Sequence, residues 1–453
     1  MKRTVVCLLA CFVLAACGTA RLAPGAVSPA STAEIQEERP RVLASPAPGT
    51  LYVDPSVDWG EISPYVYGTN YGPMHAVPLD MLPLVQESGL MALRWPGGAW
   101  TDTVDMKPFQ IDQFKDFWEM LGATPTISVR LLNGAPETAA ELVRYTNIEK
   151  GYGVRYWSIG NEPTLFESQS RQAYDTVRFN QEWRAIAEAM KAADPSIQLM
   201  GPELHQWAAN LEATPKDSSG RDWMTEFLKA NGDLVDVVTV HRYPLFRSGG
   251  QAVAVDEMRK NTEEWPAEVQ YLREIVREIT GRDLPVAFTE VNSSPTGSMG
   301  GEASPDSFYN AIWYADVLGR MISEDVFMVN QWVLSQRTTG LGLIYGNEAR
   351  PTLYTFHLYK HFGNQQVGAA SDLDEVTVYA AKREDGKLTI MVINLADTEQ
   401  RAPLKIEGRQ PASVEVWRLD AEHEAENLGE QAWPADGVVV LPGQSATMYV
   451  IGE

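Results

Sequence analysis

Cysteine is almost absent from this chain. Only three cysteines occur among 453 residues, and all three fall within the first 17 positions. Residues 18–453 therefore contain no thiol that could form a disulfide, act as a nucleophile or bind a metal. Histidine is also scarce, with six residues and no His-x-His pair, which argues against a hydrolase that gathers several histidines around a metal. We accordingly predict neither a metal nor another cofactor.

Positive charge is in short supply as well. The chain has 37 Lys and Arg against 60 Asp and Glu, a formal net charge of -23. A phosphate backbone or an anionic membrane surface would be repelled over most of such a protein, so we exclude nucleic acid as a partner. A neutral sugar polymer would not be repelled, although acidity also serves solubility alone.

Long hydrophobic runs are missing beyond the N-terminus, so no later segment is expected to span a bilayer. Residues 1–16 predict an export signal, with Lys2 and Arg3 before an apolar stretch that ends in Leu14-Ala-Ala-Cys17. These four residues with Gly18 resemble the bacterial lipobox, which implies cleavage before Cys17 and lipid attachment to it. We expect an exported lipoprotein held to the cell envelope only through Cys17, with residues 17–50, rich in Ala, Pro and Ser, as a tether.

Between residues 51 and 365, apolar β-rich runs alternate with segments of helical periodicity. Eight such repeats predict a (β/α)8 barrel, whose active site lies at the carboxyl ends of the strands. An open doubly wound sheet is the alternative, but the first strand is not followed by the Gly-rich phosphate loop which that fold uses. The predicted strands are Tyr65–Asn70, Met91–Trp95, Thr126–Arg130, Tyr156–Ile159, Ile197–Met200, Val237–Val240, Val286–Thr289 and Val326–Trp332.

Residues 366–453 show a different pattern of short alternating strands separated by turn-rich pieces. This pattern predicts a C-terminal antiparallel β-sandwich, to which residues 51–58 could add one strand. The predicted strands are Val376–Ala380, Leu388–Asn394, Ser413–Trp417, Gly437–Leu441 and Ala446–Ile451.

Two glutamates follow predicted barrel strands: Glu162 after the fourth and Glu290 after the seventh. Strands four and seven face each other across the mouth of an eight-stranded barrel, so both carboxylates can reach one substrate atom. A retaining glycosidase needs such a pair, one acid beside the leaving oxygen and one nucleophile about 5 to 5.5 Å away. The pairing predicts a glycosidase.

Neighbouring residues predict different roles for the two glutamates. Asn161 offers an amide where a sugar 2-hydroxyl would lie. Tyr243, after strand six, could donate its hydroxyl to Glu290, and Arg94, after strand two, adds positive charge nearby. We therefore expect an ionised Glu290 and a protonated Glu162.

Taken together, Asn161-Glu-Pro163, Thr289-Glu290, His241-x-Tyr243, Arg94 and Trp332 resemble the large clan of retaining glycoside hydrolases with (β/α)8 barrels. Residues 62–70 and 93–98 are similar to the α-L-arabinofuranosidase family and to the endoglucanase and xyloglucanase family, which also carry a C-terminal β-sandwich. The resemblance implies Glu162 as acid/base and Glu290 as nucleophile. It further implies a surrounding site of Arg94, Asn161, His241, Tyr243 and Trp332.

Several alternatives stay open. Trp100 and Trp332 are the tryptophans we expect to form walls against sugar rings, and Glu203 is expected to support the site rather than react. His205 could lie over the cleft or on the surface. Within enzymes, an α-L-arabinofuranosidase and a β-glucanase or β-xylosidase are both possible; a lipid-anchored sugar-binding protein with an inactive barrel is the alternative outside enzymes.

Overall fold

The computed structural model describes residues 42–73, 76–246, 252–296, 301–337 and 340–452. The predicted export signal and Cys17 lie outside the described residues. Among the helices of the described part of the chain, none combines the length and apolar character needed to cross a bilayer.

Eight parallel strands close into a barrel, in which the last strand pairs with the first. All eight fall on predicted runs, because strands covered on both faces are continuously apolar. Together with the C-terminal sheet below, this confirms the predicted fold class. The strands are β2 (Gly68–Asn70), β3 (Ala92–Trp95), β4 (Thr124–Val129), β5 (Tyr156–Ile159), β6 (Gln198–Leu204), β7 (Val237–Arg242), β8 (Val286–Val291) and β9 (Met328–Gln331).

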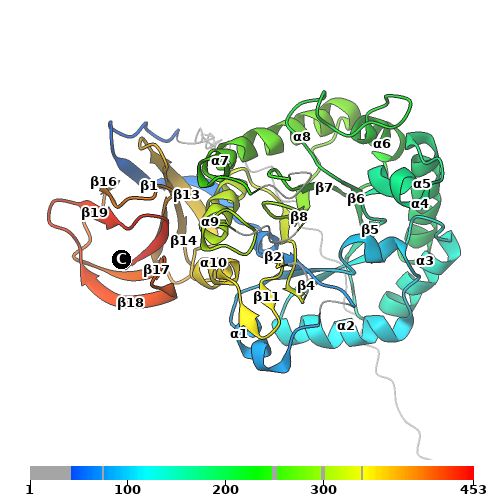
Figure 1. The fold of residues 1–453 in the computed structure, drawn as a ribbon, viewed down its shortest axis with the longest axis horizontal. Coiled ribbons are helices and arrows are strands. Elements are labelled where there is room, and N and C mark those ends of the chain that lie inside the picture. Colours follow the sequence, from blue (N-terminus) through cyan, green and yellow to red (C-terminus); the bar gives the residue numbers. More distant parts are fainter. Residues whose placement is uncertain (1–41, 74–75, 247–251, 297–300, 338–339, 453) are drawn as a thin grey trace, which may run out of the picture. The chain divides into compact units, whose positions relative to one another are not determined.

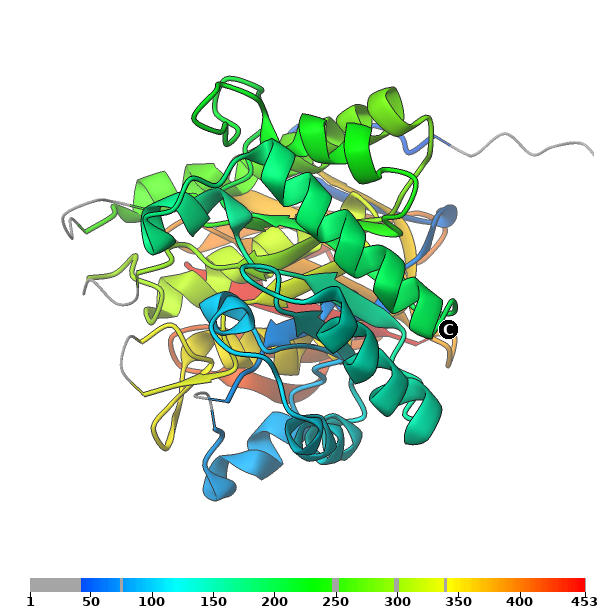
Figure 2. The ribbon, with the colours of Figure 1, turned by 90° about the vertical axis from the view of Figure 1, so that its right-hand side faces the viewer.

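Helices surround the strands, as Figure 1 and the turned view of Figure 2 show. Several begin at a residue whose side chain accepts a backbone N–H of the first turn, among them Asp175, Asp222 and Ser307. The helices are α1 (Leu82–Gln86), α2 (Pro108–Leu121), α3 (Pro136–Val143), α4 (Phe166–Ser170), α5 (Thr176–Ala193), α6 (Trp223–Asn231), α7 (Val255–Asn261), α8 (Trp265–Thr280), α9 (Phe308–Ser323) and α10 (Pro351–Tyr359).

The barrel interior changes from apolar to charged along the strands. Near their amino ends a buried apolar layer fills the barrel: Ala92, Tyr156, Met200, Val237, Ala287 and Met328. Further along the inward face of β7, Thr239 and then His241 follow Val237, all fully buried or nearly so. The apolar layer closes one end, so polar chemistry is confined to the carboxyl end.

A nine-stranded sheet follows the barrel, in the order β18-β17-β20-β15-β14-β13-β1-β16-β19. It is antiparallel except where β1 runs parallel to β16, and β1 joins it from before the barrel. The sequence patterns missed β13, β16 and β18. The strands are β1 (Leu51–Glu61), β13 (Gln365–Ser371), β14 (Val376–Lys382), β15 (Leu388–Asn394), β16 (Gln400–Ile406), β17 (Ser413–Leu419), β18 (Glu424–Ala432), β19 (Val438–Leu441) and β20 (Ser445–Ile451). A small separate sheet contains β10 (Ser335–Gln336), β11 (Ile344–Tyr345) and β12 (Glu348–Ala349).

Helices α9 and α10 pack against this sheet. Gly319 of α9 lies under the ring of Tyr379 in β14, where an added Cβ would come within 2.3 Å of a ring carbon. The Tyr379 hydroxyl donates to Asp316 at 2.7 Å. The ring of His361, just after α10, stacks on Trp417 with centroids 3.8 Å apart. His361 is thereby a packing residue at this contact.

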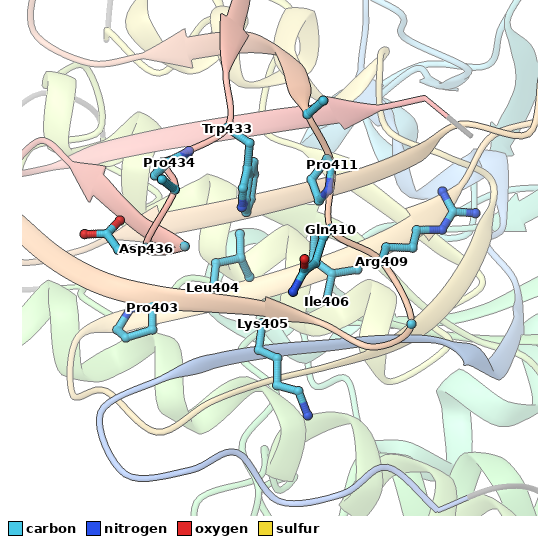
Figure 3. Close-up of a pocket in the computed structure, with 14 residues that line it drawn as sticks. Pro403, Leu404, Lys405, Ile406, Arg409, Gln410, Pro411, Trp433, Pro434 and Asp436 are labelled. Carbon is cyan, nitrogen blue, oxygen red and sulfur yellow. The ribbon is translucent and has the colours of Figure 1, made fainter.

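The end of β16 and the neighbouring segments 408–412 and 433–437 line an open hollow of about 910 Å³. The indole of Trp433 projects into it between Pro434 and Pro411, above Leu404 (Figure 3). Arg409, Gln410 and Asp436 supply its polar lining.

Candidate active site

The ends of β5 and β8 bring two glutamates together. One carboxylate oxygen of Glu162 and one of Glu290 lie within 4.8 Å of each other, and a ring nitrogen of His241 lies within the same distance of both. The Glu290 side chain is 4% exposed and that of Glu162 is 16% exposed. Glu290 therefore lies deeper, and Glu162 is more open to solvent.

A break in strand register turns Glu290 inward. Ala287 lies in the inner layer and Phe288 in the outer core, so strict alternation would place Glu290 outside the barrel. The pairing of β8 with β9 shifts between Phe288 and Val291, and the extra residue re-aims the side chain. Such bulges are common beside active sites.

Both oxygens of Glu290 accept a hydrogen bond. Arg94 Nη1 donates to Oε1 at 2.8 Å, and the Tyr243 hydroxyl donates to Oε2 at 2.6 Å. Burial, together with the charges of Glu290 and Glu162, raises the pKa of Tyr243 well above its ordinary value, so the phenol keeps its proton. The two donors fix the orientation of the Glu290 carboxylate.

Arg94 links the residues around the pair. The side chain is completely buried. Its Nη1 also donates to Asn70 Oδ1 at 3.0 Å, and its Nη2 donates to Asn161 Oδ1 at 2.8 Å and lies 3.4 Å from Glu203 Oε2. The Asn161 oxygen is occupied by this bond, which directs its amide NH₂ elsewhere.

His241 lies between carboxylates. Its Nδ1 is 3.0 Å from Glu162 Oε1 and 3.6 Å from Glu290 Oε2, while Nε2 is 3.0 Å from Glu203 Oε2. Burial lowers the pKa of His241, but Glu290, Glu162 and Glu203 outweigh burial and raise this pKa to about 9. The imidazole is positively charged at neutral pH.

The surroundings of Glu162 act on its pKa in opposite directions. Burial would raise its pKa, but His205 Nδ1 at 3.2 Å and His241 hold the pKa below its ordinary value. The two imidazoles therefore favour the ionised carboxylate, against the expectation of a protonated Glu162.

Comparison with known proteins identifies the chemistry of this barrel. Residues 150–396, more than half of the chain, match the family model described as glycosyl hydrolases family 39. The chain belongs to this family. It is therefore a glycosidase that hydrolyses O-glycosyl compounds, as predicted, and its substrate is a carbohydrate.

Curated relatives of this family 39 chain include two kinds of glycosidase. Alpha-L-arabinofuranosidase C of Emericella nidulans is 22% identical, over 91% of this chain and 97% of the relative. An intracellular exo-alpha-(1->5)-L-arabinofuranosidase of Streptomyces lividans is 25% identical over 36% of this chain and 29% of its own length. Endoglucanase A of Paenibacillus lautus is 26% identical, over 61% of this chain and 45% of the relative.

Solved structures share the fold of the family 39 chain. A bifunctional glucanase-xylanase from a metagenome library superposes with a TM-score of 0.70 at 18% identity, over 90% of this chain and 99% of the other. The alpha-L-arabinofuranosidase from Thermotoga maritima gives 0.69 at 18% identity, over 89% and 99%. Both confirm the expected resemblance to barrel glycosidases that carry a C-terminal sandwich.

Asp102 fixes the loops of the family 39 site and was not recognised from the sequence. It ends the 3-10 helix Gly98–Asp102 after β3. Its carboxylate accepts the backbone N–H of Leu131 and Leu132 at 2.8 and 2.9 Å and that of Asn161 at 2.8 Å. Burial outweighs these bonds and raises the pKa of Asp102 to about 6. The residue ties the loops after β3, β4 and β5 together.

Trp332 lies over the Gly97-Gly98 turn. A Cβ added to Gly98, which has φ +70°, would come within 2.4 Å of the indole. Glycine is therefore needed here both for the backbone conformation and for the approach of the ring. Trp332 follows β9 and Trp100 lies in the helix Gly98–Asp102, and both side chains are partly exposed. The sugar-binding roles of both tryptophans stay predictions.

Three residues that contact the site were not predicted to belong to it or were left undecided: Asn70, Asp102 and His205. Asn70 ends a strand-like run, as the expected supporting residue Glu203 follows one, and this is a detectable signal. Asp102 and His205 lie between the strands, in a short 3-10 helix and a bend, where no periodicity indicates which way a side chain points.

Three residues of the site resemble a set of metal ligands. Glu162, His241 and Glu290 present atoms close enough together to share a metal ion. However, Arg94 already contacts Glu290 at 2.8 Å, and an added cation would be repelled by this guanidinium and by a charged His241. The arrangement is better suited to acid/base and nucleophilic chemistry.

Proposed function

We propose that this chain is a retaining glycosidase of plant-type oligo- or polysaccharides, with Glu290 as nucleophile and Glu162 as acid/base. The observation that carries the proposal is the approach of the two carboxylates to within 4.8 Å. Retaining enzymes place their carboxyl groups about 5 to 5.5 Å apart, whereas inverting enzymes need roughly 6.5 to 9.5 Å to admit a water.

In the first step, an oxygen of Glu290 attacks the anomeric carbon. The glycosidic carbon–oxygen bond breaks, and the leaving oxygen takes a proton from Glu162. Arg94 and Tyr243 suit Glu290 to this role, because their hydrogen bonds orient the carboxylate before attack. Glu162 is the more exposed of the two, which suits a residue that meets the leaving group.

In the second step, Glu162 takes a proton from water as the water oxygen attacks the anomeric carbon. The ester bond to Glu290 breaks, and the sugar leaves with its original configuration. Asn161 is positioned by Arg94 and Asp102 and is proposed to bind the sugar 2-hydroxyl.

The test is product stereochemistry together with trapping. Proton NMR of the first-formed product should show the anomeric configuration of the substrate. A 2-fluoro glycoside with a good leaving group should label the enzyme at Glu290, found by peptide mass spectrometry. An inverted product, or a label on another residue, would overturn the proposal.

The sugar is proposed to come from either of two classes. Relatives are named as arabinofuranosidases and as an endoglucanase, and the acidic surface suits a neutral glycan. A panel of aryl α-L-arabinofuranoside, β-xyloside and β-glucoside with polymeric glucans would decide between them. An inactive sugar-binding barrel is not favoured, since both carboxylates are present and paired.

We also propose that the enzyme is exported and anchored to the cell envelope through a lipid on Cys17. The support is the Leu14-Ala-Ala-Cys17 sequence alone. Radiolabelled palmitate should enter the wild-type protein but not a Cys17→Ser variant. Equal labelling of both would contradict the anchor.

A further inference from the structure

A third carboxylate, Glu203, lies beneath the glutamate pair and does not face solvent. The side chain is completely buried at the end of β6. The pairing of β6 with β7 shifts between Pro202 and Leu204, and this bulge turns Glu203 into the barrel. A buried charge at such a position needs partners, and these partners define its role.

Among the described residues, each polar contact of the Glu203 carboxylate is with a donor. Oε1 accepts the Ser158 hydroxyl at 2.5 Å, and Oε2 accepts the Thr289 hydroxyl at 2.5 Å. Arg94 Nη2 at 3.4 Å and His241 Nε2 at 3.0 Å complete the set. Burial would raise the pKa of Glu203, but Arg94 and His241 lower it to about 2. Glu203 is therefore ionised and can only accept.

The hydrogen bonds of His241 place one proton on Nε2 and one between Nδ1 and Glu162. Nδ1 faces Glu162 and Nε2 faces Glu203, each at 3.0 Å. Because an ionised Glu203 only accepts, Nε2 carries a proton. The second proton lies either on Glu162, with Nδ1 accepting, or on Nδ1, and the lowered pKa of Glu162 favours the imidazolium, which donates to both carboxylates. The charged and titratable groups around this ring network, from all the elements packed there, are Glu162, Glu203, Glu290, Arg94, Tyr243 and His205.

We propose that Glu203 is a positioning residue that keeps His241 doubly protonated, so that the Glu162–His241 pair holds the proton which the leaving oxygen takes. This rests on the proposed function. As the glycosidic bond breaks, Glu162 gives its proton to the leaving oxygen and His241 Nδ1 supplies that proton to Glu162 across 3.0 Å. In the second step, the proton taken from water returns through Glu162 to His241. Throughout, Nε2–H stays on the ring, bonded to Glu203.

The arrangement explains how an ionised Glu162 can serve as an acid. Two imidazoles hold the pKa of Glu162 below its ordinary value, whereas neighbouring carboxylates raise the pKa of His241 to about 9. Below that pH the pair retains one proton, and above it the proton is lost. Glu203 raises the pKa of His241 and does not contact the substrate, because its side chain is fully buried.

The experiment titrates His241 directly in the full-length chain, by two-dimensional NMR of protein labelled only at histidine. Comparison with a His241→Gln variant assigns the signal. In Glu203→Gln the pKa of His241 should fall by about 1 to 3 pH units, the usual effect of one adjacent opposite charge. The matched control is Glu268→Gln, since Glu268 is also buried but pairs with Arg242; its His241 pKa should equal that of the wild type.

Activity provides a second readout. The alkaline limb of kcat/KM against pH should move to lower pH in Glu203→Gln by the same interval as the NMR titration. An aryl glycoside with a strongly acidic phenol, which leaves without protonation, should be cleaved with much less loss than an alkyl glycoside. A merely structural role would instead lower kcat/KM by one factor at every pH and for both substrates.

Two results overturn the proposal: an unchanged His241 pKa in Glu203→Gln, or a wild-type His241 that titrates at or below the ordinary value of about 6.5. The second result needs no variant, so it stands even if Glu203→Gln fails to fold. If the wild type cleaves no glycoside on the panel while the His241 pKa falls as expected, the proposed function fails and the coupling of Glu203 to His241 stands.

Discussion

The barrel mouth and the hollow at the edge of the C-terminal sheet differ in whether their charged side chains are buried and paired. At the mouth, Arg94, Glu203 and His241 are fully buried, and each contacts a group of opposite charge. In the hollow, Asp436, Lys405 and Gln410 are exposed, and Lys405 pairs with Glu407 outside it. Burying charge is expensive, so it persists where paired partners share the cost.

This difference indicates which concavity does chemistry. Space alone, about 910 Å³ in the hollow, does not activate a bond. Converging buried charges preorganise a field at one point, and such fields stabilise developing charge in a transition state. The predictions below test whether activity depends on the mouth and not on the hollow.

The largest effect is expected for Glu290→Ala. Removing the nucleophile should lower kcat by about 10⁴- to 10⁶-fold, as for other enzymes that lose a group acting in covalent catalysis. The measurement is steady-state hydrolysis of the best aryl glycoside from the panel. Added azide should restore turnover and give a glycosyl azide of inverted configuration, because the small anion attacks from the vacated side. An azide product of retained configuration would assign the nucleophile elsewhere.

A large effect that depends on the leaving group is expected for Glu162→Ala. Loss of general acid/base catalysis costs about 10² to 10⁴ in rate. The cost should fall on kcat/KM for substrates with poor leaving groups and be small for dinitrophenyl glycosides. Azide should here give a product of retained configuration. Equal losses for good and poor leaving groups would contradict the acid role.

The sequence predicts where the barrel strands lie better than it predicts which way the side chains at their ends point. Continuous apolar runs predicted all eight barrel strands, and hence the strand ends near which Glu162 and Glu290 lie. They could not predict the bulges that turn Glu203 and Glu290 inward, because a bulge breaks the two-residue alternation. They also could not predict the lowered pKa of Glu162, since it depends in part on His205, a residue outside the strands.

The missed strands of the sheet have a physical explanation. β18, with the sequence EAENLGEQA, is an edge strand with mostly exposed side chains. Its pairing with β17 supplies backbone hydrogen bonds that need no apolar alternation. β16 alternates exposed and buried residues, but its exposed positions carry Arg401, Pro403 and Lys405 rather than the β-branched and aromatic side chains that mark a strand. An edge strand such as β18 tolerates charged residues and even favours them.

A moderate effect is expected for Tyr243→Phe. The change removes one of the two hydrogen bonds to Glu290 and keeps the ring. A hydrogen bond to a charged group is worth about 1.5 to 3 kcal/mol, so kcat/KM should fall roughly 10- to 150-fold. Thermal unfolding should show whether stability changes. The control is Tyr314→Phe on α9, a buried tyrosine away from the mouth, for which kcat/KM should be unchanged. A loss under threefold for Tyr243→Phe would weaken the case that Glu290 must be oriented before attack.

The smallest effect on catalysis is expected for Trp433→Ala in the hollow. Trp433 is half-buried and contacts Tyr449 edge to face, with ring centroids 6.0 Å apart, so its loss removes packing from the sheet core. Stability should fall by about 1 to 3 kcal/mol, measured by urea unfolding. Because none of the charged groups at the mouth contacts this residue in the described structure, kcat/KM on aryl glycosides should stay within twofold of wild type. A tenfold loss with the fold intact would mean that the sheet communicates with the barrel mouth, and the two regions could not then be treated as independent.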